Sequence, residues 1–342
     1  EIGTRCIHLR QTHEVVKLLR DIVEAAAPQC VLITETNVPN GENISYFGSS
    51  DEAHMVYQFS LPPLLLYALH RGTASQLTHW AMDYPRPPND CTYLNFIASH
   101  DGIGLRPLEG ILSANEVNGL IESMREYGGY VAMKSNPDGT EGPYEINISL
   151  FDALKGTWRG TDQWQISRFI CAQSVMLVIQ GIPALYLHSL TATPNDQKGV
   201  EQSGRTRSIN RHRWALDELS RLLQDAASAQ AIVLAELKHR LRIRSQQQAF
   251  HPESDQQTID LGDSLFSLWR LGRHQRILAV HNITDQPQQL ALPPHPCAEK
   301  AACWKDLLSD EIYPREQVDV SLGPYQARWL EACGALGESP SG

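Results

Sequence analysis

Short apolar stretches alternate with stretches of helical periodicity over the first two thirds of the chain, and this alternation constrains the fold most strongly. The apolar stretches predict strands at residues 30–34, 55–60, 92–99 and 182–190. Side chains at helical spacing predict helices at residues 12–27, 64–72, 163–181 and 215–244. Strands that alternate with helices favour a parallel sheet with crossover helices, and repeated units of this size suit a (β/α) barrel.

About four such strands are present, which would make half of an eight-stranded barrel and leave the sheet edges open. We therefore expect an α/β fold in residues 1–246, the C-terminal half of a (β/α)8 TIM barrel (strands 5–8), with a loop-rich excursion after its third strand. The sequence opens at Glu1 without a methionine, and an N-terminally truncated fragment is the simplest explanation. Short strands separated by Pro, Gly, Asp and Asn then predict a small antiparallel all-β domain over residues 247–331, followed by a disordered tail at 332–342.

Polar side chains come at the ends of two predicted strands. Glu35 ends the first strand within the phrase ITETN, and His100 and Asp101 end the third strand within NFIASHDG. The carboxyl ends of parallel strands point into a shared ligand crevice, where one Glu and one Asp suit chemistry that needs a proton donor and a charge stabiliser. Plainer interpretations remain open: Glu35 as a capping or salt-bridged acid, and the Asp-Gly dipeptide as a turn.

The charge and cysteine content argue against several classes of partner. The net charge of −10 disfavours nucleic acid and anionic membranes as the main partner. Seven scattered cysteines without a Cys-x-x-Cys pair indicate reduced thiols in a cytoplasmic protein, and neither a disulfide framework nor a metal site. No apolar run is long enough to span a bilayer. We expect no cofactor. An arginine-rich stretch favours a phosphate or carboxylate partner, and its members are Arg205, Arg207, Arg211 and Arg213.

Several phrases, in order along the chain, carry a resemblance to a known family. ITETN, NFIASHDG and GRTRSINRHRW resemble glycoside hydrolase family 13, the α-amylase superfamily. Within that family, DEAHMVYQFSLPPLLLYAL and YLHSLTATPND look like the sucrose phosphorylase branch, and SHDGIGLRPLEGILS is similar to the glucosylglycerate phosphorylases. The resemblance covers essentially the whole chain, from the segment after the fourth barrel strand to the C-terminal β domain.

The resemblance implies roles for single residues. Glu35 matches the general acid/base, which protonates the glycosidic oxygen and later deprotonates the acceptor. Asp101 matches the carboxylate that holds the glucose hydroxyls and stabilises the oxocarbenium-like transition state. His100 matches a neutral donor to the same sugar, Asn37 a further substrate contact, and Arg211 an arginine that closes the glucose subsite by pairing with an acid outside this chain.

The same resemblance places the nucleophile outside the chain. In this family the nucleophile is an Asp in an Arg-x-Asp motif on the fourth strand, upstream of Glu1. A retaining mechanism needs two carboxyl groups about 5–5.5 Å apart across the anomeric carbon. We therefore expect the polypeptide as given to be inactive and the full-length protein to be an enzyme.

Acceptor choice depends on the segment EGPYEIN. Sucrose phosphorylases have Tyr followed by Gln there, whereas this chain keeps Tyr144 and has Glu145. A carboxylate only accepts hydrogen bonds, which favours glucosylglycerate over sucrose as the donor. Because glycerate is itself an anion, Glu145 would have to point away from it, and the predicted counter-charges are Arg106, Lys134 and Arg205.

Three functions remain open from the sequence. The first is a retaining α-glucoside phosphorylase that transfers glucose to inorganic phosphate and gives α-glucose 1-phosphate. The second is a hydrolase or transglucosidase of the same superfamily. The third is a vestigial, non-catalytic sugar-binding protein. Open sheet edges also predict aggregation or self-association, of which a homo-oligomer is one form.

Overall fold

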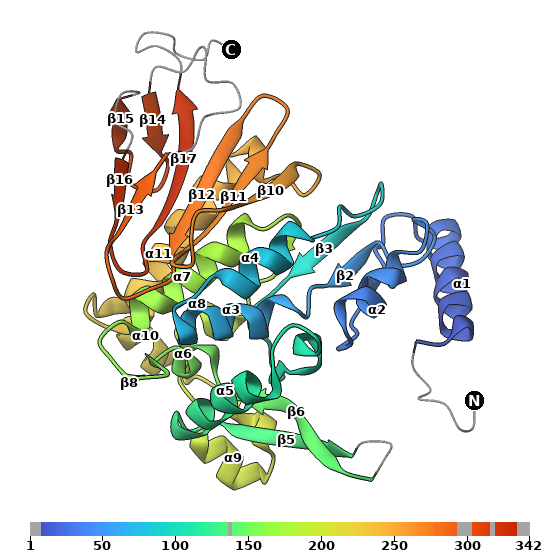
Figure 1. Ribbon diagram of the computed structural model, residues 1–342. Coiled ribbons are helices and arrows are strands. Elements are labelled where there is room, and N and C mark those ends of the chain that lie inside the picture. Colours follow the sequence, from blue (N-terminus) through green and yellow to red (C-terminus); the bar gives the residue numbers. More distant parts are fainter. Residues whose placement is uncertain (1–7, 136–138, 293–302, 315–318, 334–342) are drawn as a thin grey trace.

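A parallel sheet forms the centre of the first two thirds of the molecule. The computed structural model describes residues 8–135, 139–292, 303–314 and 319–333 (Figure 1). The sheet has the order β1-β2-β3-β9, and every neighbouring pair is parallel. Its strands are β1 (Ile33–Thr34), β2 (Met55–Tyr57), β3 (Thr92–Asn95) and β9 (Ile182–Pro183). The predicted parallel α/β arrangement is confirmed, and β1 and β9 are the outer strands of this sheet.

Helices accompany this sheet in the first two thirds of the chain. They include α1 (Arg10–Ala26), α3 (Leu61–Arg71), α4 (Ser75–Met82), α7 (Gln165–Val178) and α11 (Ala229–Ser245). Two of them, the apolar helices α3 and α7, form much of the core. Prolines occupy the first turn of α3, where an N–H has no helical partner, and Gly72 ends it with a φ of 69°. All residues of α3 except its last are buried. Each fully buried leucine there contributes roughly 1.5–3 kcal/mol.

Three predicted element boundaries are wrong. The strand expected at 182–190 ends at Pro183, which has no N–H for the ladder, and the chain then forms α8 (Leu187–Leu190). The helix expected at 215–244 is two helices, α10 (Leu216–Gln224) and α11, because the Ser228 hydroxyl caps a new helix by accepting from Ala231 N–H at 3.0 Å. The strand expected to reach His100 ends at Asn95.

The excursion after β3 is more ordered than predicted. It holds a three-stranded antiparallel sheet of order β4-β6-β5, made of β4 (Ile103–Gly104), β5 (Tyr130–Ser135) and β6 (Glu141–Asn147). Helix α5 (Ala114–Glu126) precedes this hairpin, and its N-terminus carries a capping box between Ser113 and Glu116. Helix α9 (Gln197–Ser203) and the 3₁₀ helix η3 (Thr206–Asn210) follow later in the chain. The sheet and η3 bring residues distant in sequence beside the end of β3.

Antiparallel strands make up the last part of the described chain, as predicted. A six-stranded sheet has the order β10-β11-β12-β17-β14-β15, and β13 pairs with β16. The bounds are β10 (Asp255–Asp260), β11 (Leu265–Leu271), β12 (Arg276–Asn282), β13 (Gln288–Ala291), β14 (Cys303–Asp306), β15 (Ile312–Pro314), β16 (Asp319–Leu322) and β17 (Ala327–Cys333). One continuous apolar cluster joins this sheet to the helices, since Phe266 and Trp329 belong to the same cluster as Leu64. The predicted tail lies almost entirely outside the described residues.

The remaining elements are short connections. They are α2 (Asn40–Ile44), η1 (Ser45–Phe47), η2 (Arg106–Leu108), α6 (Leu150–Ala153), β7 (Gly156–Thr157), β8 (Gly160–Thr161) and η4 (Gln248–Phe250). Among the helices of the described residues, none has the length and apolarity needed to cross a membrane.

Candidate active site

Glu35 directly follows β1, as predicted, and its side chain is exposed. The neighbouring strand β2 ends at Tyr57, whose pKa is raised by burial and by the negative charge of Glu35. Because Thr34 pairs with Val56 in the parallel β1–β2 pair, Glu35 and Tyr57 are the next residues on neighbouring strands, at the carboxyl end of the sheet. A carboxylate in this position is accessible to a ligand in the crevice.

An aromatic cluster adjoins Glu35 at this edge of the sheet. The rings of Tyr57 and Phe96 meet edge to face with centroids 5.3 Å apart, and Phe59 meets Phe96 at 5.1 Å. Phe96 immediately follows β3, so the cluster spans the ends of two neighbouring strands. No role was predicted for these rings from the sequence, although each lies within a predicted apolar strand segment. Tyr57 and Phe59 are partly exposed, whereas Phe96 is buried, so the cluster makes this edge of the sheet partly apolar.

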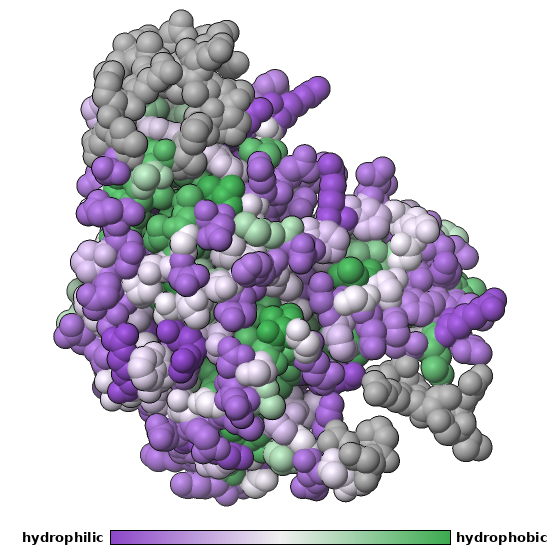
Figure 2. Space-filling view, in the orientation of Figure 1, coloured by the Kyte–Doolittle hydropathy of each residue, from purple (hydrophilic) through white to green (hydrophobic). Residues whose placement is uncertain are grey.

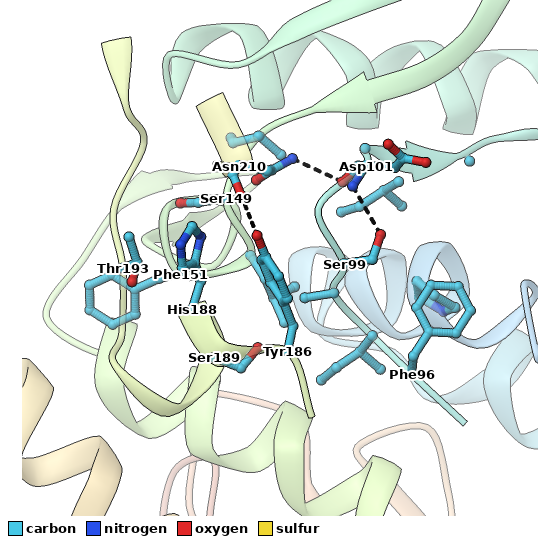
Figure 3. Close-up of a pocket in the computed structure, with 18 of the residues that line it drawn as sticks. Phe96, Ser99, Asp101, Ser149, Phe151, Tyr186, His188, Ser189, Thr193 and Asn210 are labelled. Carbon is cyan, nitrogen blue, oxygen red and sulfur yellow. Dashed lines mark hydrogen bonds between the residues drawn. The ribbon is translucent and has the colours of Figure 1, made fainter. Parts of the chain in front are cut away.

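Asp101 lies on the loop six residues beyond β3, and backbone contacts fix its place. Its N–H donates to the Ser99 hydroxyl at 3.1 Å, and its carbonyl accepts from the Asn210 amide at 3.0 Å. The Tyr186 hydroxyl donates to the Asn210 carbonyl at 2.7 Å, which links Asp101 to the segment after β9 (Figure 3). The loop is therefore held from two directions.

Two arginines hold the Asp101 carboxylate itself. Arg207 Nη1 and Arg211 Nη2 each lie 3.0 Å from Asp101 Oδ1. Arg211 also donates through Nε to the His100 carbonyl at 3.0 Å, and His100 Nε2 lies 3.7 Å from Asp101 Oδ1. Both cations contact Oδ1. The predicted residues His100, Asp101 and Arg211 are thus brought together, and Arg211 pairs with an acid of this chain.

Arg207 joins Asp101 to Glu145, a contact that the sequence did not predict. Its Nε and Nη2 donate to the two carboxylate oxygens of Glu145 at 3.0 and 2.7 Å. This bidentate geometry, with Glu145 only 4% exposed, raises the pKa of Arg207 above its usual value. The arginine-rich stretch was the sequence feature that could have predicted this contact, but its spacing did not show which arginine pairs with which acid.

The counter-charges predicted for an anionic acceptor are placed as follows. Arg106 donates to the Asn37 carbonyl at 3.5 Å, and Lys134 lies 5.9 Å from the centroid of the Tyr144 ring. Both also lie near Glu109, at 3.7 and 3.8 Å. Arg205 is exposed on the turn before η3, and the role of these three residues toward an acceptor stays a prediction.

Asn37 and Tyr144 lie beside the three-stranded sheet. A Cβ at Gly104 would fall 2.5 Å from Asn37 Nδ2, so a larger residue on β4 would displace the Asn37 amide from this position. The Asn37 Oδ1 atom is buried and has no hydrogen-bond partner among the residues that the structure describes. The backbone carbonyl of Tyr144 accepts a hydrogen bond from the Leu105 N–H at 3.0 Å.

A narrow cavity lies beneath Asp101, between the end of β3 and the segment after β9 (Figure 3). Its apolar walls include Phe59 and Phe96, and its polar groups include Tyr186 and His188. Burial lowers the pKa of His188 and so favours the neutral form of its ring. No group of three or more His, Cys, Asp or Glu side chains suited to a metal ion occurs within the described ranges.

Comparisons with known proteins give a consistent set of relatives. The chain is 41% identical over 332 residues to a glucosylglycerate phosphorylase of Allomeiothermus silvanus, covering 96% of this chain and 57% of that protein. It is 40% identical over 337 residues to a glucosylglycerate phosphorylase of Escherichia coli K12, covering 97% and 58%. The chain thus spans somewhat more than half the length of these relatives. No family model matches the chain.

A solved structure shares the fold. The sucrose 6F-phosphate phosphorylase of Thermoanaerobacter thermosaccharolyticum superposes with a TM-score of 0.69 at 21% identity, over 83% of this chain and 54% of that one. At this identity the likeness shows a common fold, that of (β/α)-barrel enzymes matched over part of their length.

Proposed function

The chain belongs to the sucrose and glucosylglycerate phosphorylase branch of glycoside hydrolase family 13, and on this premise we propose that the protein containing it is a retaining α-glucoside phosphorylase. The proposed reaction moves glucose from glucosylglycerate or sucrose to inorganic phosphate and gives α-glucose 1-phosphate. The substrates and the phosphate are the proposed partners. The free thiols of Cys30, Cys91, Cys171 and Cys303 support a cytoplasmic location, which cell fractionation would test.

The observation that carries this proposal is the arrangement of two carboxylates at one edge of the sheet. Glu35 is exposed at the end of β1, and Asp101 is held by two arginines on the loop after β3. An exposed carboxyl group can exchange protons with a glycosidic oxygen, which suits Glu35 as general acid and base. A carboxylate fixed by several contacts suits Asp101 for holding glucose hydroxyls in the transition state.

The remaining predicted residues surround these two. His100 and Arg211 contact Asp101 or its neighbour and are proposed to bind the same glucose unit. Tyr144, Glu145 and Asn37 lie on or beside the three-stranded sheet and are proposed to shape the acceptor side. Because Arg207 binds both oxygens of Glu145, this carboxylate is neutralised, which supports an anionic acceptor such as glycerate over fructose.

The nucleophile is proposed to come from a carboxylate outside these residues. In the sheet, β2 separates β1 from β3, so the strand axes that precede Glu35 and Asp101 lie about 10 Å apart. A retaining pair is only about 5–5.5 Å apart. We propose that β1, β2, β3 and β9 are strands 5–8 of an eight-stranded barrel, and that a strand pairing with β1 would bring the nucleophile next to Glu35.

Product analysis with and without phosphate tests the proposed function. The protein that contains this chain is incubated with glucosylglycerate or sucrose, and glucose 1-phosphate and free glucose are measured. We expect glucose 1-phosphate only when phosphate is present, and faster turnover of glucosylglycerate. Glu35→Gln should lower the rate about 10³-fold, whereas Glu42→Gln on α2 should not. Phosphate-independent release of glucose would point to a hydrolase instead, and no turnover of any α-glucoside would point to a non-catalytic protein.

A further inference from the structure

A further cavity lies where the end of α3, the β7–β8 hairpin and the loop after β12 meet. Backbone hydrogen bonds hold its walls: the Trp158 N–H donates to the His70 carbonyl at 3.2 Å, and the Tyr325 N–H donates to the Thr284 carbonyl at 3.1 Å. In Figure 1, β8 and β13 lie on the opposite side of the view from α1 and α2, which flank Glu35 in the sequence. The cavity is therefore remote from the proposed reaction site.

An exposed tryptophan forms one wall of this cavity. Trp158 and Arg159 are the two turn residues of the β7–β8 hairpin, and Trp158 is 51% exposed. The guanidinium carbons of Arg71 and Arg159 lie 5.2 and 5.4 Å from the centroid of its ring. An indole offers a large, rigid apolar surface together with a polar N–H, which suits a ligand that is itself partly apolar and partly polar.

A buried histidine without a hydrogen bond points independently to a ligand. His70 lines the cavity and is 2% exposed, and neither Nδ1 nor Nε2 has a hydrogen-bond partner within the described part of the chain. Buried polar groups are nearly always hydrogen-bonded. Burial, with the nearby charges of Arg71 and Arg168, lowers the pKa of His70 to about 4, so near pH 7 the ring is neutral. It then offers one donor and one acceptor, which matches a hydroxyl group.

The other polar groups of the cavity favour an uncharged ligand. The Asp285 carboxylate lines it and lies 3.4 Å from Arg159 Nη1, so one of the two guanidinium groups already has a counter-charge. A carboxylate in this place repels anions but accepts hydrogen bonds from hydroxyl groups. The amides of Gln286 and Gln288 add both donors and acceptors. This mixture suits a hydroxyl-rich molecule better than a phosphate or a cation.

We propose that this cavity is a second sugar-binding site, which takes an uncharged pyranose with its apolar face on Trp158 and a hydroxyl group on His70. The site goes beyond the proposed function, because it uses none of the residues assigned to the reaction. It holds a sugar without converting it.

Fluorine nuclear magnetic resonance of the protein that contains this chain, labelled with 5-fluorotryptophan, tests the proposal. Trp158→Phe identifies the resonance of Trp158 as the one that disappears. We expect titration with methyl α-glucopyranoside to shift this resonance until it saturates, and glycerol, which has hydroxyl groups but no ring, to leave it in place. Asp101→Asn alters the proposed reaction site and should not change the shift, which separates the two sites.

A substitution that keeps a ring separates binding from packing. His70→Phe removes both nitrogens, and we expect it to weaken the binding read at Trp158 about tenfold, as for loss of one hydrogen bond. The matched control is His79→Phe, which changes an exposed histidine of α4 that does not line the cavity and should leave the affinity unchanged. Asp285→Ala should also weaken binding and changes only a partly exposed loop residue, so the test stands if the His70 variant does not fold.

Three results would overturn the second sugar site. They are no shift of the Trp158 resonance with the glucoside, the same shift with glycerol, and an unchanged affinity in both the His70 and the Asp285 variants. A shift with inorganic phosphate but not with the glucoside would also overturn it and would make the cavity an anion site. The outcome does not depend on turnover, so failure of the phosphorylase assay and failure of this proposal are distinguishable.

Discussion

Arg207 organises the acidic residues of the site at the scale of single side chains. It contacts Asp101, which the sequence placed at a strand end, and Glu145, which lies on an inserted sheet. The sequence identified both acids and the arginine-rich stretch. It did not show the pairing, because the direction of each arginine depends on the 3₁₀ turn of η3 and on its packing against β6.

Removing Arg207 should destabilise the fold by leaving Glu145 buried without a counter-charge. We expect Arg207→Ala to lower the free energy of unfolding by about 2 kcal/mol, measured by urea denaturation near pH 7. Adding Glu145→Gln to this variant should recover part of the loss, since it removes the unpaired charge. Arg213→Ala serves as the control and should stay within about 0.5 kcal/mol of the unsubstituted chain. Equal stability of the Arg207 and Arg213 variants would contradict this account.

At the scale of elements, long apolar segments were predictable and half-exposed ones were not. Helix α3 is an almost wholly apolar run with prolines in its first turn and Gly72 at its end. Its hydrophobic pattern, its leucine content and its terminating glycine therefore all indicate the same helix. Strands β5 and β6 include polar residues and a register shift between Ala132 and Met133, and they pair in an insertion that only the tertiary structure defines. The end of β3 was placed several residues too late, and the α10–α11 break, which the Ser228 cap produces, was not predicted.

Helix α3 also carries a buried histidine that should make stability depend on pH. His70 is 2% exposed, and burial lowers its pKa from 6.5 to about 4. Between these values the unfolded chain binds a proton that the folded chain does not, so stability should fall as the pH drops from 6.5 to 4. We expect a loss on the order of 3 kcal/mol from this residue.

Urea denaturation at several pH values would measure this effect. His70→Leu should flatten the slope between pH 6.5 and 4, whereas His79→Gln, at an exposed position of α4, should leave it unchanged. His281 is buried with its pKa also lowered to about 4, so part of the slope should persist in the His70 variant. An unchanged slope in the His70 variant would exclude this residue as a cause.

At the scale of the whole molecule, helix α1 presents an apolar face that is exposed in the described part of the chain. Val15, Leu18, Leu19 and Ile22 are 45–57% exposed, although they recur at helical spacing. Figure 2 shows the part around α1 projecting as a lobe from the main body. Beside this helix, β1 is an outer strand of the parallel sheet. The helix was predicted from this periodicity. An apolar stripe at helical spacing normally packs against another surface, so we expect this face to be covered.

The chain by itself should therefore self-associate through this region. We expect light scattering to give a mass above that of one chain at micromolar concentration, because exposed apolar faces and open strand edges favour association. The double substitution Leu18→Lys and Ile22→Lys should shift the mass toward that of a single chain. Asp21→Lys, which changes charge off the apolar face, should not. A monodisperse monomer of the unsubstituted chain would contradict this expectation.

The configuration of the sugar phosphate tests the central claim most directly. The protein that contains this chain is given an α-glucoside and phosphate, and the anomeric configuration of the glucose 1-phosphate is read by nuclear magnetic resonance. Two displacements at the anomeric carbon, with Glu35 as acid and base, predict α-glucose 1-phosphate as the sole phosphorylated product, and its loss in Glu35→Gln. Formation of β-glucose 1-phosphate, or full activity of the Glu35 variant, would contradict a retaining phosphorylase that acts through this site.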